Sequence, residues 1–98
     1  MAQEVRSVKY RVVYTPQAEK SLEKLADKAP QIAKDILGKI EWLAEKTDEI
    51  HHERLRGHRD FSLHCGQYRI LYLWDRKGGK IIIELIGKHD EVYHKLRR

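Results

Sequence analysis

The stretch from Tyr68 to Trp74 constrains the fold more than any other part of the chain. It has the length of a strand, is rich in aromatic and branched apolar residues, and lies between turn residues at 66–67 and 78–79. Alternate side chains of a strand face opposite ways, so one face is apolar or aromatic, while the other carries Arg69 between apolar neighbours. An arginine in this position needs either a partner within the protein or an anion that it is presented to.

The first half of the chain predicts a strand followed by two helices. Residues 7–14 alternate in the manner of a half-buried strand. Thr15-Pro16 is a helix start, because threonine can cap a helix and proline fits its first turn. Pro30 is expected to end this helix and to open a second amphipathic helix that ends near Lys46. Because the link between the two helices is short, we expect an antiparallel helical hairpin.

The second half predicts a loop and then a meander of three strands. Residues 47–60 are strongly charged and have no clear period, which indicates a loop. Phe61–Cys65 alternates again and joins the strand at 68–74 through a two-residue turn, Gly66-Gln67. A second turn leads into the third strand, Lys80–Ile86.

The chain is expected to end in a short helix over Glu91–Lys95, capped by Asp90. Its 98 residues are enough for one hydrophobic core. The sequence therefore predicts a single α+β domain over residues 1–98 with the order β-α-α-β-β-β. In this fold, an antiparallel sheet carries the helical hairpin on one face.

Charge is distributed unevenly along the chain. Residues 1–50 carry nine Lys or Arg and nine Asp or Glu, whereas residues 51–98 carry eleven and six, so the formal charge of +5 belongs to the second half. All six histidines are also in the second half. This distribution fits a surface for an anion such as nucleic acid, and it equally fits a basic but inert surface.

The cysteine count and the apolar runs indicate the cellular setting. The single cysteine, Cys65, excludes an internal disulfide framework and fits a reducing compartment. Because Cys65 shares a strand face with Leu63, we expect its thiol to be buried and inert. The longest apolar runs, such as Ile81–Ile83, are too short to span a bilayer, and the N-terminus lacks the apolar region of a secretory signal. We therefore expect a cytoplasmic protein with no membrane partner.

The first hairpin turn determines which polar side chains meet. With Gly66-Gln67 as a two-residue turn, His64 lies opposite Arg69, and both project from the same face as Ser62. The same polar face is expected to receive side chains from the end of the third strand, the short helix and the charged loop: Lys88, His89, Tyr93, Arg54 and Arg56.

This set of side chains suits the cleavage of RNA without a metal ion. Arginine can bind phosphate through two hydrogen bonds, and histidine can act as an acid or a base near neutral pH. Carboxylates for Mg²⁺ are scattered, and no C-x₂-C or H-x₃-H spacing indicates zinc, so we predict neither a metal nor another cofactor. The ribose 2′-OH would attack the adjacent phosphate, and the cations would stabilise the added negative charge.

Each candidate residue also has a purely structural interpretation. His64 can be an exposed strand residue, and Tyr93 can pack on the sheet. Arg69 can be the ion-pair partner of Asp60 or Glu84. Three histidines of the charged loop are expected to be solvated: His51, His52 and His58. Four aromatic residues are expected in the core: Tyr10, Trp42, Tyr72 and Trp74.

Four motifs follow one another in order along nearly the whole chain. They are Thr15-Pro16 at the start of the first helix, Arg54–Asp60, Gly66–Tyr72, and Ile86–His89 followed by Val92-Tyr93. Together they resemble the RelE branch of the RelE/ParE toxin superfamily. The resemblance implies a RelE-like fold and a toxin that is paired with a RelB-like antitoxin. It also implies a metal-free endoribonuclease that cuts mRNA in the ribosomal A site.

The resemblance extends to the candidate site, with two departures. Arg69 and Tyr93 match the family's arginine and tyrosine, and His89 stands where many members have arginine and some have histidine. The hairpin positions that are often lysine or arginine in the family are Ser62 and His64 in this chain.

The resemblance implies a different role in phosphodiester cleavage for each of these residues. Arg69 would hold the scissile phosphate and stabilise the transition state, and His89 would be the general acid for the leaving 5′ oxygen. Tyr93 would stack on or position a base, or help to activate the 2′-OH, with His64 as the alternative base. The residues expected to bind the phosphate backbone are Lys88, Arg56 and Arg54.

Two other functions stay open for this sequence. A ParE-like member of the superfamily would inhibit DNA gyrase and would not cleave RNA. A non-catalytic module would bind RNA or another partner without cleavage, with binding that depends on salt. In either toxin interpretation, an acidic segment of the antitoxin would lie over the basic face or over the helical hairpin.

Overall fold

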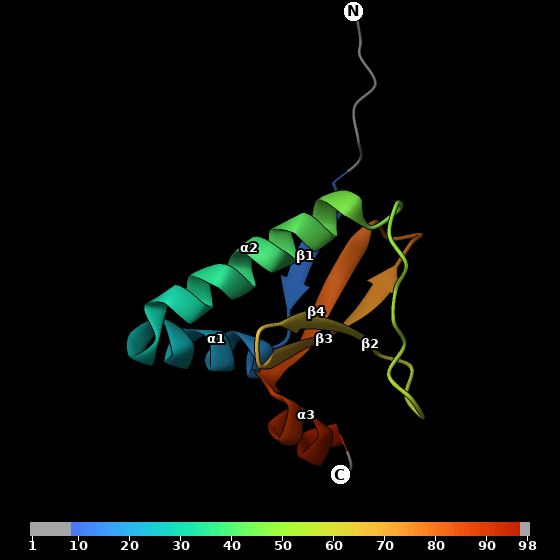
Figure 1. The fold of residues 1–98 in the computed structure, drawn as a ribbon. Coiled ribbons are helices and arrows are strands. Elements are labelled where there is room, and N and C mark those ends of the chain that lie inside the picture. Colours follow the sequence, from blue (N-terminus) through green and yellow to red (C-terminus); the bar gives the residue numbers. More distant parts are fainter. Residues whose placement is uncertain (1–8, 97–98) are drawn as a thin grey trace, which may run out of the picture.

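The computed structural model describes residues 9–96, which form a four-stranded sheet and three helices (Figure 1). The order of the elements is the predicted one, and the part of the first strand predicted at residues 7–8 lies outside the described residues. The elements are β1 (Arg11–Tyr14), α1 (Pro16–Lys28), α2 (Pro30–Lys46), β2 (Phe61–Cys65), β3 (Tyr68–Asp75), β4 (Lys80–Lys88) and α3 (His89–Leu96).

The strand order is β1-β4-β3-β2, and the sheet is mixed. β2, β3 and β4 form the predicted antiparallel meander, but β1 pairs with β4 in parallel, so the prediction of a wholly antiparallel sheet is wrong. The chain leaves β1 for two helices and returns at the far edge of the sheet, and such a long crossover permits parallel pairing. The junction is fixed at Thr15, whose N–H donates to the Ile83 carbonyl at 3.0 Å.

The helical hairpin begins with the predicted cap and covers one face of the sheet (Figure 1). The Thr15 hydroxyl accepts the Ala18 N–H at 3.1 Å and donates to the Glu84 carbonyl at 2.8 Å, so it joins α1 to β4. The larger core lies between this hairpin and the sheet. Its fully buried members include Ile36, Ile40 and Leu43 from α2, and Ile70, Tyr72, Ile81 and Ile83 from the sheet.

Trp42 is not part of this core, so its predicted burial is wrong. Its side chain is 39 % exposed, and the Lys39 ammonium lies 5.0 Å from the ring centroid. Each helical residue is rotated about 100° from the previous one, so the buried position of Leu43 turns Trp42 toward solvent. Tyr10 and Tyr72 are buried as predicted, and Trp74 is half-buried against the core.

The opposite face of the sheet carries a second, smaller core. α3 packs there through Val92, against Leu71 and Leu85 from the strands and Leu55 from the loop. The pairing of β3 with β4 shifts register at Leu71 and Tyr72, which leaves Glu84 as an extra residue in β4. This bulge turns Leu85 to the face opposite Ile83, and so it supplies the apolar surface under α3.

The loop of residues 47–60 is held by His52, whose predicted solvation is wrong. The His52 Nε2–H donates to the Thr47 carbonyl at 2.8 Å, which leaves Nδ1 to accept the Tyr72 hydroxyl at 2.6 Å. The ring also stacks on Trp74, with 4.5 Å between the ring centroids. Only the folded sheet creates this aromatic surface. His51 is exposed as predicted, and His58 is half-buried.

No helix in the described part of the chain has the length and apolar character needed to cross a membrane.

Candidate active site

The hairpin of β2 and β3 places His64 and Arg69 side by side, as predicted. The turn has Gly66 at φ +61°, a conformation that glycine adopts without strain, and the pairs Cys65–Tyr68 and His64–Arg69 follow from it. Neighbouring residues of the hairpin pack against the helices, so His64 and Arg69 project from the face that bears α3.

A segment of the loop extends this face beyond the edge of β2. The Leu55 N–H donates to the Asp60 carbonyl and the Ser62 N–H donates to the Glu53 carbonyl, both at 2.8 Å. Residues 53–55 thus pair with β2 like a short additional strand, with Arg54 opposite Phe61. This pairing brings the charged loop to the candidate site, as expected from the sequence.

The loop and the hairpin enclose a hollow of about 320 Å³, which we call the arginine hollow. It contains three arginines and one histidine against a single carboxylate, so its charge favours an anion. Its lining residues are Glu53, Arg54, Leu55, Arg56, Ser62, His64 and Arg69. Sequence reasoning missed Glu53, although its alternation with Leu55 fits a strand-like segment.

The arginines of the hollow differ in how strongly the protein holds them. Arg54 lies over the Phe61 ring at 4.5 Å, and its Nη1 donates to the Arg59 carbonyl at 2.9 Å. Arg69 is half-buried, and within residues 9–96 it has no ion pair with Asp60 or Glu84. Of the two explanations for an arginine in this strand, the structure therefore favours presentation to an external anion.

Ser62 lies in the hollow with an unsatisfied hydroxyl. Its side chain is 6 % exposed, and among the described residues its Oγ has no hydrogen-bond partner. Burial of an unpaired hydroxyl costs about 1–3 kcal/mol. The sequence indicated that Ser62 would share the face of His64 and Arg69, but not that its hydroxyl would lack a partner.

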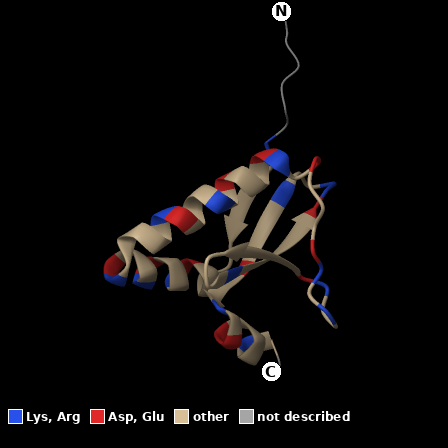
Figure 2. Cartoon of the chain, viewed as in Figure 1, with Lys and Arg blue, Asp and Glu red and all other residues tan. Residues whose placement is uncertain are grey.

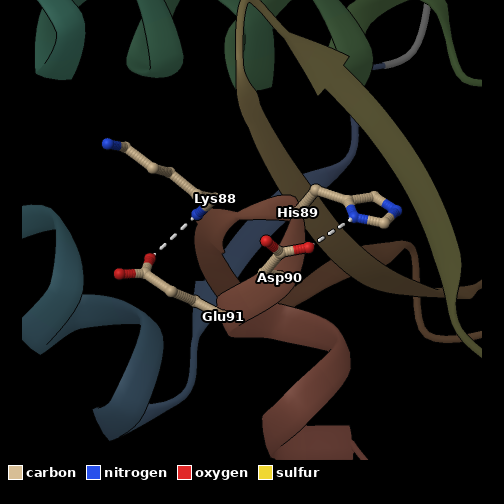
Figure 3. Close-up of polar contacts among 4 residues, drawn as sticks. All are labelled: Lys88, His89, Asp90 and Glu91. Atoms are coloured by element: carbon tan, nitrogen blue, oxygen red, sulfur yellow. Dashed lines mark hydrogen bonds and ion pairs between the residues drawn. The ribbon is translucent and has the colours of Figure 1, made fainter.

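The other predicted site residues lie at the start of α3. The rings of His89 and Tyr93 pack edge to face, with 4.2 Å between their centroids. Together with Asp90 and His94 they line a hollow of about 280 Å³. The His89 Nδ1 lies 3.3 Å from the Asp90 carboxylate, so Asp90 contacts the imidazole (Figure 3).

The side chain of Glu91 caps the start of α3, and the prediction that Asp90 caps it is wrong, because Asp90 lies inside the first turn. The Glu91 carboxylate accepts the Lys88 N–H at 2.9 Å, which is half of a capping box, and the helix therefore begins at His89 (Figure 3). Lys88 and His89 point to opposite sides of this helix start (Figure 3). The structure thus separates Lys88 from the imidazole with which it was expected to act.

Strand pairing relates the two hollows to each other. Arg69 pairs with His64 on one side and with Gly87 on the other, and His89 follows Gly87 by two residues. The hollows share no lining residue. However, Leu55 lines the arginine hollow, Tyr93 lines the other hollow, and both side chains pack in the same small core. A Cβ at Gly87 would lie 3.0 Å from the Glu91 carboxylate, so glycine allows α3 to pack closely here.

Burial raises the pKa of one thiol and of one carboxyl group on the sheet. Cys65 is half-buried, so the expected full burial is wrong, but burial still raises the pKa of its thiol, which stays protonated at neutral pH. Burial, with a smaller effect of Asp60, also raises the pKa of Glu84. Within residues 9–96, no cluster of three or more His, Cys, Asp or Glu side chains is placed to hold a metal ion.

Sequence comparison identifies the family of this fold. Residues 12–93 match the profile of the ParE toxin of the type II toxin–antitoxin system parDE. The chain belongs to this family of toxins. None of the curated protein sequences matches the toxin.

Solved structures of other toxins share its fold. The toxin–antitoxin complex RelBE2 from Mycobacterium tuberculosis has 25% identity over 88% of this toxin and 98% of that chain, with a TM-score of 0.71. A mutant of the Escherichia coli toxin RelE has 21% identity, coverage of 88% and 92%, and a TM-score of 0.69. A YoeB/ParE toxin from Agrobacterium tumefaciens has 16% identity, coverage of 81% and 98%, and a TM-score of 0.69. The predicted RelE/ParE superfamily is therefore confirmed.

Proposed function

We propose that this toxin is a metal-independent endoribonuclease of the RelE branch that cleaves mRNA in the ribosomal A site. The observation that carries the proposal is Arg69, which faces the arginine hollow level with His64 and has no carboxylate partner in the described chain. A guanidinium without an ion-pair partner can bind a phosphodiester and stabilise the charge that develops during its cleavage.

The proposed catalytic roles belong to residues that line the two hollows. Arg69 holds the scissile phosphate, and Arg56, which is exposed in the same hollow, binds the adjoining backbone. His89 donates a proton to the leaving 5′ oxygen, and Tyr93, packed against it, positions a base or helps to activate the 2′-OH. His64 is the alternative base. Arg54 contributes mainly positive charge, because its guanidinium is already bound to Arg59 and Phe61.

We also propose a cognate antitoxin as the protein partner. Several of the similar structures are toxin–antitoxin complexes: RelBE2 of Mycobacterium tuberculosis, the RelB-RelE complex of Methanococcus jannaschii and intact RelBE of Escherichia coli. The basic second half of this chain would attract an acidic antitoxin segment.

A second candidate function is inhibition of DNA gyrase, because the matching sequence profile is that of ParE toxins. In this case the basic residues would bind a protein or DNA surface, and no RNA bond would break. A gyrase supercoiling assay and an assay of RNA cleavage on translating ribosomes, carried out with the same preparation, distinguish the two functions.

Substitution of Arg69 tests the nuclease proposal. Arg69→Ala should lower the rate of cleavage by about 10²–10³ and abolish growth arrest on expression, because it removes a donor to the transition state. Arg11→Ala is the matched control, because Arg11 is exposed on β1 at the other edge of the sheet. Full cleavage by Arg69→Ala, or an equal loss in Arg11→Ala, contradicts the proposed site.

A further inference from the structure

A third hollow region lies between α1 and α3, away from the arginine hollow and from the hollow at His89 and Tyr93. One part, of about 270 Å³, includes the apolar side chains Leu25, Tyr68 and Ile86. The adjoining part, of about 390 Å³, follows the first half of α1. The two parts share Ser21, Lys24 and Lys95, so they form one groove, which we call the lysine groove. It has no lining residue in common with the arginine hollow.

The charged residues of α1 that line this groove are lysines, and none of the acidic residues of α1 lines it. Lys20, Lys24 and Lys28 recur every four residues and lie along the groove, about 6 Å apart along the helix axis. The acidic residues of the helix recur with the same spacing on a neighbouring ridge, and none of them lines the groove: Glu19, Glu23 and Asp27. Figure 2 shows these blue and red segments alternating along α1.

The α3 side of the groove is also basic. Lys95 contributes a fourth ammonium group. Glu91 is the one acidic lining residue in the described chain, and one of its carboxylate oxygens already accepts the Lys88 N–H. Lys88 itself points to the side on which α1 lies, away from His89 (Figure 3). The groove therefore combines an apolar interior with a rim whose charge remains positive.

We propose that the lysine groove is a docking site for an acidic, amphipathic segment of the antitoxin. Apolar side chains of the segment would contact Leu25 and Ile86, and its carboxylates would face the lysines of α1 and α3. This inference rests on the proposed antitoxin partner and assigns to that partner a surface separate from the catalytic one.

The composition of the groove favours a peptide over RNA. Nucleic acid offers no aliphatic side chains to contact Leu25 and Ile86. Single strands bind mainly on several aromatic surfaces beside a basic channel, whereas Tyr68 is the one aromatic lining residue of this groove in the described chain. The cationic side chains that line the groove are all lysines, which act as point charges. The arginines suited to bidentate phosphate binding lie in the arginine hollow.

A binding experiment with the whole chain tests this assignment. The probe is a fluorescein-labelled helical peptide with a leucine ridge flanked by glutamates, measured by fluorescence anisotropy. The comparison probes are the same peptide with glutamines and an oligouridylate with 2′-O-methyl groups, which cannot be cleaved. We expect the glutamate peptide to bind with a Kd tighter than about 1 mM, and more tightly than either comparison probe.

Matched charge reversals locate the bound peptide. Lys24→Glu combined with Lys28→Glu should weaken binding at least about tenfold, because like charges would then face each other. Lys34→Glu combined with Lys77→Glu makes the same change of charge at exposed positions outside the groove, and it should have less than about a twofold effect. Ser21→Trp should also weaken binding, because it fills the groove without changing its charge.

Several results would overturn the assignment. The first two are a lack of binding by the glutamate peptide and equal binding by the glutamine peptide. The third is an equal effect of the two charge reversals. The fourth is tighter binding of the oligouridylate through Lys24 and Lys28. Circular dichroism of each variant establishes that it is folded. Because the assay needs no RNA cleavage, its failure can be distinguished from failure of the nuclease proposal.

Discussion

At the scale of single residues, His52 and Tyr72 connect the loop to the sheet. The hydrogen bond between them is 2.6 Å long, and Tyr72 lies fully buried beneath the imidazole. The next residues of the loop, 53–56, carry the side chains that enclose the arginine hollow. The position of that hollow therefore depends on a histidine that makes no contact with its interior.

Alkaline titration tests the contact between His52 and Tyr72. Burial raises the pKa of Tyr72 to about 12 from its usual 10.0, because the folded state disfavours the phenolate. The resulting stability is complete below pH 10.0 and is lost as the pH rises toward about 12, with an upper limit of about 2–3 kcal/mol. Tyr72→Phe should be about 1 kcal/mol less stable near pH 8, and the difference should shrink by pH 12. A constant difference in urea unfolding across this range would contradict this account.

Ser62 offers a second test at this scale. Because its buried hydroxyl has no partner among the described residues, Ser62→Ala removes a desolvated polar group without breaking a hydrogen bond. We expect the free energy of unfolding to stay the same or to rise by up to about 1 kcal/mol. A loss of more than about 1 kcal/mol in chemical denaturation would mean that the hydroxyl has a partner in solution.

At the scale of elements, α3 carries His89 and Tyr93, and its first turn depends on Glu91. Glu91→Ala removes the acceptor for the Lys88 N–H and should cost about 0.5–1 kcal/mol of stability. It should also slow RNA cleavage, because the start of the helix positions the His89 ring. Glu91→Gln keeps an acceptor oxygen and serves as the control in both thermal unfolding and cleavage assays. Equal behaviour of the two variants would show that the cap is unimportant.

Local sequence patterns predict where the helices and strands lie better than they predict what surrounds each element in the folded protein. Alternation and the turn at Gly66-Gln67 were enough to predict the register that places His64 opposite Arg69. The direction of β1 could not be predicted, because no local signal specifies whether an edge strand joins the sheet in parallel. The contacts of His52 and the exposure of Trp42 likewise depend on surfaces that exist only after the helices and the sheet have packed.

At the scale of the whole molecule, the two faces of the sheet have different surroundings. The helical hairpin covers one face (Figure 1) and forms most of the core. The other face carries the arginine hollow and the His89–Tyr93 pair. The lysine groove lies between α1 and α3, outside both hollows. In the proposed functions, the substrate and the protein partner bind to different basic surfaces, one rich in arginine and the other in lysine.

The most direct test of this account is a single-atom change in the RNA. Programmed ribosomes carry an mRNA with either a ribonucleotide or a 2′-deoxynucleotide at the A-site position that is cut, and the 3′ ends of the products are analysed. The proposed attack by the 2′-OH predicts cleavage of the ribonucleotide substrate alone, with loss of that cleavage in Arg69→Ala. Cleavage of both substrates, or of neither while gyrase supercoiling is inhibited, would contradict the nuclease mechanism.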